Sequence, residues 1–541
     1  MCASIKLEKV HLLSSFSSAD SPASMPSSTD KFQSRTSHGS KQMCMISGLR
    51  CYLQKNKGLI RQLLVGLTVS WTAFLNGVYL GWPSPLMEIL SKPSAAFTGS
   101  PSERELEFMV AALDMGTIFS PIPCCYFIDK FGRRPLLILV GPMSLVGWLL
   151  AYFWSSMTSL YAVRLIQGLQ CGIANTIVPL YISEMAEPRI RGTLNTIPGA
   201  ALNVGVLYGY IIGLFGSYDA LTALCVIVTV PYAIAVLFIP ETPYFHLMRG
   251  EEDKARAILD ATRDGLDELE FAEMKRSVAE EMQQKLETSL LTSPTDLRSL
   301  FTVLFTYVGA TFTYFWVIPE YAALTIGRGT QDKIMTTNQF AVLLGLITLA
   351  GTVPAAYLVD RMGRKPLLML SCALTALFAF AAAVYFYVHE KDLADTSGWS
   401  FCICLFVSGL LCSASLGLGQ MPFILQSEYF PASSRAIAGA IVSGVGAVFS
   451  VISALLYPDT AKSVGMYFNY VISGAAASLV FVYCHFEMLE TRGLTFAEIQ
   501  RRFVARAKGI ALSEAEEDEC AMKLPPIKSD ATHTKKSLSA C

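Results

Sequence analysis

The sequence predicts an all-α membrane protein whose twelve transmembrane helices form two six-helix bundles. First, 52% of its 541 residues are hydrophobic and only 16% are charged, whereas charged residues make up about a quarter of a typical soluble domain. Second, apolar segments of about twenty residues, the length that crosses the hydrocarbon core of a bilayer, occur in two sets of six. Third, one twelve-residue motif occurs twice, 231 residues apart (360 minus 129). A repeat at this distance indicates two homologous halves, because solenoid repeats are far shorter.

Composition divides the chain into five regions. Residues 1–57 are rich in serine and lack a sustained apolar run, which predicts a disordered tail rather than a cleaved signal peptide. Residues 58–243 form the first bundle and residues 299–490 the second. Between them, residues 244–298 have a charged, amphipathic pattern that favours short helices on the membrane surface. Residues 491–541 form a second, polar tail.

The positions of lysine and arginine predict the topology. The expected spans are residues 62–81, 107–128, 136–155, 160–183, 193–215 and 218–239 in the first half, and 300–322, 337–359, 367–388, 399–421, 437–457 and 464–486 in the second. Most basic residues outside the tails and the linker lie in the connections after the second, fourth, eighth and tenth spans. Such loops remain in the cytoplasm, so we expect both termini and the linker there.

The repeated motif is expected to form a tight turn at the membrane surface. It reads Tyr-Phe-Ile-Asp-Lys-Phe-Gly-Arg-Arg-Pro-Leu-Leu at 126–137 and Tyr-Leu-Val-Asp-Arg-Met-Gly-Arg-Lys-Pro-Leu-Leu at 357–368. Glycine permits the turn, and proline can begin the next helix, where its missing N–H costs nothing. The charges either only set the topology or form an ion-pair clamp, and the second copy favours the clamp. The clamp residues would be Asp129, Arg133, Arg134, Asp360, Arg364 and Lys365.

A second duplication supplies acidic partners for these cations. The fourth and the tenth span each end with an acid seven residues before an arginine, Glu184 with Arg191 and Glu428 with Arg435. Two helical turns or a bend can bring both members of such a pair to one surface. Each half then closes with another acid, Glu241 and Glu490. We therefore expect one charged network at the cytoplasmic face of each half.

These motifs resemble the signature set of the sugar porter family of the major facilitator superfamily. The resemblance rests on both copies of Asp-x-x-Gly-Arg-Arg/Lys, on Pro-Leu-Tyr-Ile-Ser-Glu at 179–184, and on the motifs at 240–243 and 489–493; it covers about 60–490. Within the family, the sequence is similar to the arthropod facilitated trehalose transporters and related glucose-type carriers. This implies the major facilitator fold, in which two bundles rock around a central solute site. It also implies that the cytoplasmic networks latch the outward-facing state.

The sequence departs from the glucose-type carriers where a sugar would bind. Their seventh span opens with Gln-Gln-Leu-Ser-Gly-x-Asn; aligned on Gly309, those amide positions hold Phe305, Thr306 and Thr311. Their fifth-span glutamine aligns with Gly199. Further departures are the tenth-span run 417–423, Gly446 and Ala447 in the eleventh span, Tyr244, and Leu489. Because a polyol needs planar amides and a stacking ring, these departures weaken the assignment of a sugar but not that of the fold.

Other polar and aromatic residues at membrane depth are candidates for solute contact. A polar side chain in a span either bridges helices by a hydrogen bond or lines the cavity. Tyr314, Phe315 and Trp316 either form an aromatic outer gate, as similar residues do in the family, or face lipid. The candidate substrate-binding residues are Gln167, Gln170, Asn175, Asn203, Thr311, Tyr314, Gln420 and Phe423.

One acid lies deep in the second span. Asp114 is either a proton-coupling group or a neutral or paired carboxyl at a helix contact, with Arg164 of the fourth span as its candidate partner. Glu320 is expected at the outer rim, where water would solvate it.

The leading interpretation is a monomeric plasma-membrane carrier for a sugar or similar small polar solute, working by alternating access and facilitated diffusion. The alternatives are a transporter-like solute receptor, or a carrier of a non-sugar organic solute with proton coupling through Asp114. We expect no enzymatic activity, cofactor, metal site or nucleic-acid partner. The six histidines lack metal-ligand spacing. No Gly-x4-Gly-Lys-Ser/Thr loop occurs, which argues against an ATP-driven pump.

Overall fold

The computed structural model describes residues 57–90, 101–263, 265, 268–287, 294–329, 336–394, 399–430, 432–492, 498–499 and 502–503. The side chains of Arg191, Asp360 and Arg435 are not among those described, and most of both predicted tails lies outside these ranges. Contacts divide the chain into two units, Met1–Ile60 and Arg61–Cys541. Both predicted bundles belong to the second unit, to which everything below refers.

Every regular element that the structure describes is a helix. The first half comprises α2 (Lys57–Gly81), α3 (Pro83–Leu90), α4 (Glu103–Phe119), α5 (Pro121–Phe131), α6 (Arg134–Phe153), α7 (Met157–Met185), α8 (Pro188–Gly213), α9 (Tyr218–Ala235) and η1 (Val236–Phe238). The linker comprises α10 (Pro243–Met248), α11 (Glu252–Thr262) and α12 (Glu268–Glu287). The second half comprises α13 (Pro294–Phe312), α14 (Val317–Glu320), α15 (Ala322–Gly329), α16 (Thr337–Met362), α17 (Arg364–Glu390), α18 (Ser400–Leu416), α19 (Met421–Tyr429), α20 (Ala432–Ser463) and α21 (Met466–Glu487). The all-α class is confirmed.

The number of long apolar helices is consistent with twelve spans. Among the described residues, ten helices are long and apolar enough to cross a membrane, and α4 with α5, bent by 44°, would make eleven. The remaining predicted span corresponds to α16, whose apolar part is Asn338–Thr352. Several spans are broken: α2 continues as α3, α13 as α14, and α18 as α19.

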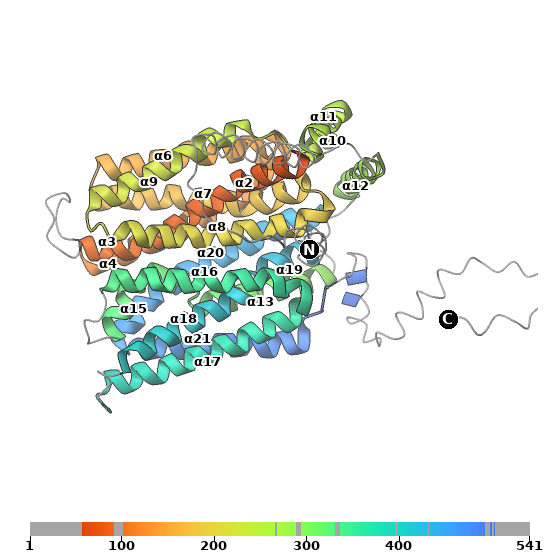
Figure 1. The fold of residues 1–541 in the computed structure, drawn as a ribbon. Coiled ribbons are helices and arrows are strands. Elements are labelled where there is room, and N and C mark those ends of the chain that lie inside the picture. The colour runs from red at the N-terminus through yellow and green to blue at the C-terminus, as the bar shows by residue number, and fades with distance from the viewer. Residues whose placement is uncertain are drawn as a thin grey trace, which may run out of the picture. The chain divides into compact units, whose positions relative to one another are not determined.

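Both copies of the repeated motif form the predicted tight turn. Gly132, between α5 and α6, and Gly363, between α16 and α17, both have φ of +95°. Residues that have a Cβ rarely adopt this left-handed backbone conformation. The two turns lie at the end of the helices where the linker helices α10 to α12 also lie, and we call this end the motif face; α3, α15 and the start of α4 lie at the opposite face (Figure 1).

The halves pack together along two pairs of equivalent helices. α8 of the first half contacts α16 of the second, and both α4 and α5 contact α20 (Figure 1). Within the first half, α4 and α7 approach closely because small residues meet there: a Cβ added to Gly168 would lie 2.0 Å from the carbonyl oxygen of Leu113. Small residues commonly allow such contacts between transmembrane helices. This contact brings Asp114 and Arg164 into one region of the bundle.

Candidate functional site

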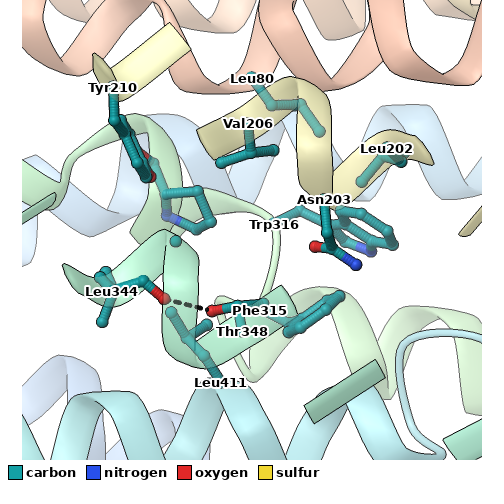
Figure 2. Close-up of a pocket in the computed structure, with 12 residues that line it drawn as sticks. Leu80, Leu202, Asn203, Val206, Tyr210, Phe315, Trp316, Leu344, Thr348 and Leu411 are labelled. Carbon is teal, nitrogen blue, oxygen red and sulfur yellow. Dashed lines mark hydrogen bonds between the residues drawn. The ribbon is translucent and has the colours of Figure 1, made fainter. Parts of the chain in front are cut away.

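A cavity of about 20 Å³ lies between the two halves. Figure 2 shows its lining residues, which are Leu80, Leu202, Asn203, Val206, Tyr210, Phe315, Trp316, Pro319, Leu344, Gly345, Thr348 and Leu411. A buried water needs roughly 10–15 Å³ of such space, so this cavity has room for about one water molecule and none for a sugar. The structure therefore shows this part of the interface in a closed arrangement.

Two of the three predicted gate aromatics line this cavity. Phe315 and Trp316 lie beside Asn203 (Figure 2), and Tyr314 and Phe315 are buried. These positions contradict the alternative that Tyr314 and Phe315 face lipid. Tyr314 has φ of 57°, an uncommon value for a residue with a side chain, at the break between α13 and α14. Its ring packs 4.9 Å from that of Tyr457 in α20.

The other candidate solute residues occupy several places. Asn203 lines the cavity, although its amide also donates to the Gly199 carbonyl at 3.1 Å. Gln420 lies across the interface from Gly199, where an added Cβ would be 3.6 Å from the Gln420 amide oxygen. An amide from the second half thus approaches the site where glucose-type carriers have a glutamine in the first.

Four further candidates make contacts with neighbouring helices or within their own. Asn175 accepts a hydrogen bond from Asn76 of α2 at 3.5 Å, and Gln170 donates to the Tyr79 hydroxyl at 2.7 Å. Thr311 donates to a carbonyl of its own helix at 3.0 Å. The Phe423 ring lies 5.7 Å from that of Tyr307. The bond from Gln170 supports the helix-bridging alternative for that residue.

Arg164 stabilises the break between α2 and α3. In a continuous helix, the carbonyl of Tyr79 would accept a hydrogen bond from the N–H four residues later, but position 83 is a proline without an N–H. Arg164 Nη1 donates to this carbonyl instead, at 2.7 Å, and also to the side-chain oxygen of Gln167 at 3.4 Å. The guanidinium carbon lies 5.1 Å from the centre of the Trp82 ring. Arg164 therefore ties α7 to the kink in the first span.

Asp114 and Glu320 both interact electrostatically with this buried arginine. Arg164 is fully buried, and Glu320 and Asp114 are the two acidic side chains that interact with it most strongly. Asp114 also interacts with Ser450 of α20, a helix of the second half. The expectation that water solvates Glu320 is wrong: it is 3% exposed, because the helix break after α13 is followed by the short helix α14, which places Glu320 inside the protein. Two acids, the buried Glu320 and the partly buried Asp114, thus interact with one arginine.

In the first half, the predicted charges meet around the turn of the motif. Arg133 Nη2 pairs with Glu184 at 2.7 Å. The carboxylate of Glu241 accepts the backbone N–H groups of Arg133 and Arg134, both at 3.0 Å, and so caps the start of α6. A carboxylate is favourable there because a helix N-terminus has a partial positive charge. Thr242 also interacts with Glu184, whose Oε2 is buried without a hydrogen-bond partner.

The second half repeats this arrangement residue by residue. Arg364 pairs with Glu428 through Nε at 3.1 Å and Nη2 at 2.9 Å. Glu490 accepts the backbone N–H groups of Arg364 at 3.0 Å and Lys365 at 2.9 Å. Thr491 donates to Glu428 at 2.5 Å. The glutamate of each half-closing Glu-Thr pair therefore caps a helix, and in the second half the threonine also bonds the acid that pairs with the arginine.

Backbone carbonyls complete both networks. Tyr181 donates to the carbonyl of Pro240 at 2.7 Å, and Tyr429 to that of Leu489 at 3.1 Å. The departure at Leu489 leaves this contact intact, since the carbonyl is the acceptor in both halves. Sequence reasoning did not assign roles to Thr242, Thr491 or these tyrosines, although the repeated Glu-Thr was visible.

The linker packs against the first network. The guanidinium of Arg133 lies 5.8 Å from the ring of Phe245 in α10. His246, the next residue, pairs with Glu251 at 2.7 Å, and this hydrogen bond lowers the pKa of the Glu251 carboxyl below its usual value. Among the described residues, no cluster of three metal-ligating side chains occurs.

Known proteins resemble this chain in sequence. Facilitated trehalose transporter Tret1 of Drosophila virilis is 26% identical over 463 residues, which are 83% of this chain and 49% of that protein. Tret1 of Polypedilum vanderplanki is 25% identical; the match includes 83% of this chain and 89% of that protein. The probable metabolite transport protein CsbC of Bacillus subtilis is 28% identical, over 74% of this chain and 86% of its own. The chain thus spans about half the length of the first of these relatives and most of the other two.

Solved structures resemble the fold. The proton:xylose symporter XylE bound to 6-bromo-6-deoxy-D-glucose matches with a TM-score of 0.67 at 20% identity, over 82% of this chain and all (100%) of that one. Inward-open XylE from E. coli matches with a TM-score of 0.64 at 20% identity, over 81% and 99%.

The fold and the two networks define a multi-pass membrane transporter with the major facilitator fold. The family described as Sugar (and other) transporter matches residues 21–503. The chain belongs to this family, which is one of transporters and not of enzymes.

Proposed function

We propose that the protein carries a sugar, trehalose or a hexose-like molecule, or a similar small polar solute, across the plasma membrane by facilitated diffusion and alternating access. The proposal includes cytoplasmic termini and a carrier that acts as a monomer. The family and the trehalose-transporter relatives support a sugar. The observation that carries the proposal is the pair of equivalent networks, Arg133 with Glu184 and Arg364 with Glu428, one in each of two halves with a cavity between them.

In alternating access, the two turns that these networks hold in shape would form the cytoplasmic gate, which closes when the halves bring the turns together and opens when they rock apart. The ion pairs and helix caps described above each join parts of one half, so these contacts stabilise the turn of their own bundle. A rigid turn lets each half move as one body when the halves rock. Asp129, Arg191, Asp360 and Arg435 are proposed as further members, by their place in the motifs.

The solute would bind between the halves, in the space that the closed cavity marks. Asn203 and Gln420 are the proposed primary contacts, because amides match the donor and acceptor pattern of a polyol. Phe423 and Tyr314 are proposed as stacking and gating rings. Gln167, Gln170, Asn175 and Thr311 are proposed to contact the solute when the halves separate and their present hydrogen bonds exchange.

Uptake of labelled trehalose, glucose and a polyol at two external pH values tests the proposal. We expect saturable uptake of a sugar that does not depend on pH, and a rise in KM in Asn203→Ala and Gln420→Ala. Protein present at the surface without uptake of any of the three would refute the sugar assignment. Binding of a sugar without flux would instead support the receptor alternative.

A second candidate is a proton-coupled carrier of a non-sugar organic solute. It is favoured by the two acids that interact with Arg164, the buried Glu320 and the partly buried Asp114. For this candidate, uptake would rise at acidic external pH, and Asp114→Asn would abolish that rise. A flat pH profile would exclude it.

A further inference from the structure

A lysine from the second half binds two acids of the first half at the opposite face. Lys462, in the last turn of α20, pairs with Glu107 and with Glu103 of α4, each at 2.6 Å. Glu103 and Glu107 are four residues apart and therefore lie on the same side of the helix. Glu103 is 81% exposed at its side chain but Glu107 only 11%. An exposed ion pair contributes little to stability, whereas breaking a largely buried ion pair leaves a charge inside the protein without its partner.

Two further hydrogen bonds join the halves at this same face, and a third, within the second half, supports them. Arg328 of α15 donates to the carbonyl of Ala461 at 2.7 Å and so fixes α15 to the end of α20. The backbone N–H of Ala323, also in α15, donates to the hydroxyl of Ser84 in α3 at 3.1 Å. Tyr210 of α8 donates to the carbonyl of Pro319 at 2.7 Å. Direct bonds therefore connect α3, α4 and α8 of the first half to α14, α15 and α20 of the second.

These bonds connect the two halves, whereas the ion pairs of the motif networks lie within one half. The ion pairs of Arg133 and Arg364 join helices within one half, so they can survive a rocking motion unchanged. The ion pairs of Lys462 join the two halves, so they must break whenever the opposite face opens. A contact made in only one of two states shifts the balance between them by its own free energy.

We propose that Lys462, with Glu107 as its main partner, is a gating residue of the transport cycle that holds the opposite face closed. The proposal rests on the alternating-access function above and adds the contact that must break at this face. Glu103 contributes less, because water competes for its exposed carboxylate. Under the predicted topology this face lies outside the cell.

Thiol labelling measures opening of this face without any solute. A cysteine introduced by Leu344→Cys lines the cavity and reacts with a membrane-impermeant maleimide only when a face opens. The rate is measured in right-side-out and inside-out vesicles, and that of the same protein without Leu344→Cys is subtracted. All variants include Glu103→Gln, so that only Lys462 and Glu107 remain to pair.

We expect Lys462→Glu and Glu107→Lys each to raise the labelling rate from one side by about three- to tenfold. The double variant, with the charges exchanged, should return to within about twofold of the parent, because the pair re-forms. Lys391→Glu, at an exposed lysine just past the end of α17, makes the same charge change and should leave the rate unaltered.

Unchanged labelling in both single variants would overturn the proposal, as would an increase that the exchange does not reverse. If a charge-reversal variant does not reach the membrane, Lys462→Gln and Glu107→Gln test the same expectation. Labelling that behaves as expected without sugar uptake would refute the proposed solute and leave the gate standing.

Discussion

The two motif networks have the same design but different burial. In the first half, the side chains of Arg133 and Glu184 are 4% and 6% exposed; in the second, those of Arg364 and Glu428 are 18% and 24% exposed. Arg133 uses one nitrogen for its acid and leaves Nε and Nη1 buried without a hydrogen-bond partner, whereas Arg364 uses two nitrogens for Glu428.

The two copies of the motif therefore share the geometry of their contacts, but the ion pairs differ in how far they are shielded from water. In both halves a glutamate caps the same two backbone N–H groups, at nearly equal distances. The environment around each pair is set by what packs on it, and Phe245 of the linker covers Arg133. The first network should therefore be more sensitive to loss of a partner than the second.

The largest effect is expected from the arginines themselves. Arg133→Gln leaves Glu184 buried without its cation and should destabilise the protein by about 3–5 kcal/mol. Arg364→Gln affects a pair closer to water and should cost about 1–3 kcal/mol. The melting temperature in detergent compares the two, and equal losses would contradict the burial argument.

Transport should fall in the same variants for a second reason. If the networks hold their halves rigid, Arg133→Gln and Glu184→Ala lower uptake per surface molecule while membrane insertion persists. A variant that is unstable but fully active per molecule would show that the network stabilises the fold without serving as a gate.

The glycines of the two turns should give the next largest effect. Gly132 and Gly363 share a positive φ, and an added Cβ would lie 2.4 Å from a Glu241 oxygen and 2.8 Å from a Glu490 oxygen. Alanine at either position should cost about 2 kcal/mol or more, of which about 1–2 kcal/mol is backbone strain. The first half should again lose more, measured by melting temperature. Gly444→Ala in α20 is the control, since its Cβ meets open space.

Removal of the tyrosine hydroxyls should have a smaller effect. Tyr181→Phe and Tyr429→Phe each delete one hydrogen bond to a backbone carbonyl, at 2.7 Å and 3.1 Å. Each change should cost about 0.5–1.5 kcal/mol. Denaturation of both variants under the same conditions tests whether the shorter bond contributes more; the opposite order would show that the two sites are not energetically equivalent.

The smallest effect is expected when the two networks are made alike. Arg134 donates to the carbonyl of Leu237 at 2.9 Å, and Lys365 donates to those of His485 and Met488 at 2.9 and 3.0 Å. Arg134→Lys and Lys365→Arg should each change stability by no more than about 0.5 kcal/mol, because an ammonium and a guanidinium can both reach these carbonyls. A loss of uptake in either would reveal a role beyond the charge.

The helical fold and the partners of the motif charges could be predicted because the signals are local and repeated. Long apolar segments predict spans, and a motif with an acid, two bases, a glycine and a proline predicts a turn. The structure brings Arg133 to Glu184 and Arg364 to Glu428 as the sequence suggested. Their role as a gate remains a prediction.

The environment of the solute residues could not be predicted, because a transmembrane helix is apolar on most sides. Nothing in the sequence distinguishes Gln170, which bonds Tyr79 inside one half, from Gln420, which reaches the interface. The sequence places Glu320 near the outer end of the seventh span, which predicts that water solvates it. Its burial depends on a helix break at Tyr314, which has a positive φ. No local sequence pattern predicts this break.

The kink in the first span illustrates how one missing atom can couple distant parts of a chain. Because Pro83 lacks an N–H, the Tyr79 carbonyl must recruit a donor from elsewhere, and it recruits Arg164, 85 positions away. That same arginine is the one on which Asp114 and Glu320 act. One side chain of α7 therefore holds the bend of the first span and also interacts with acidic residues of the second and seventh spans, so that three spans of the protein meet at a single arginine.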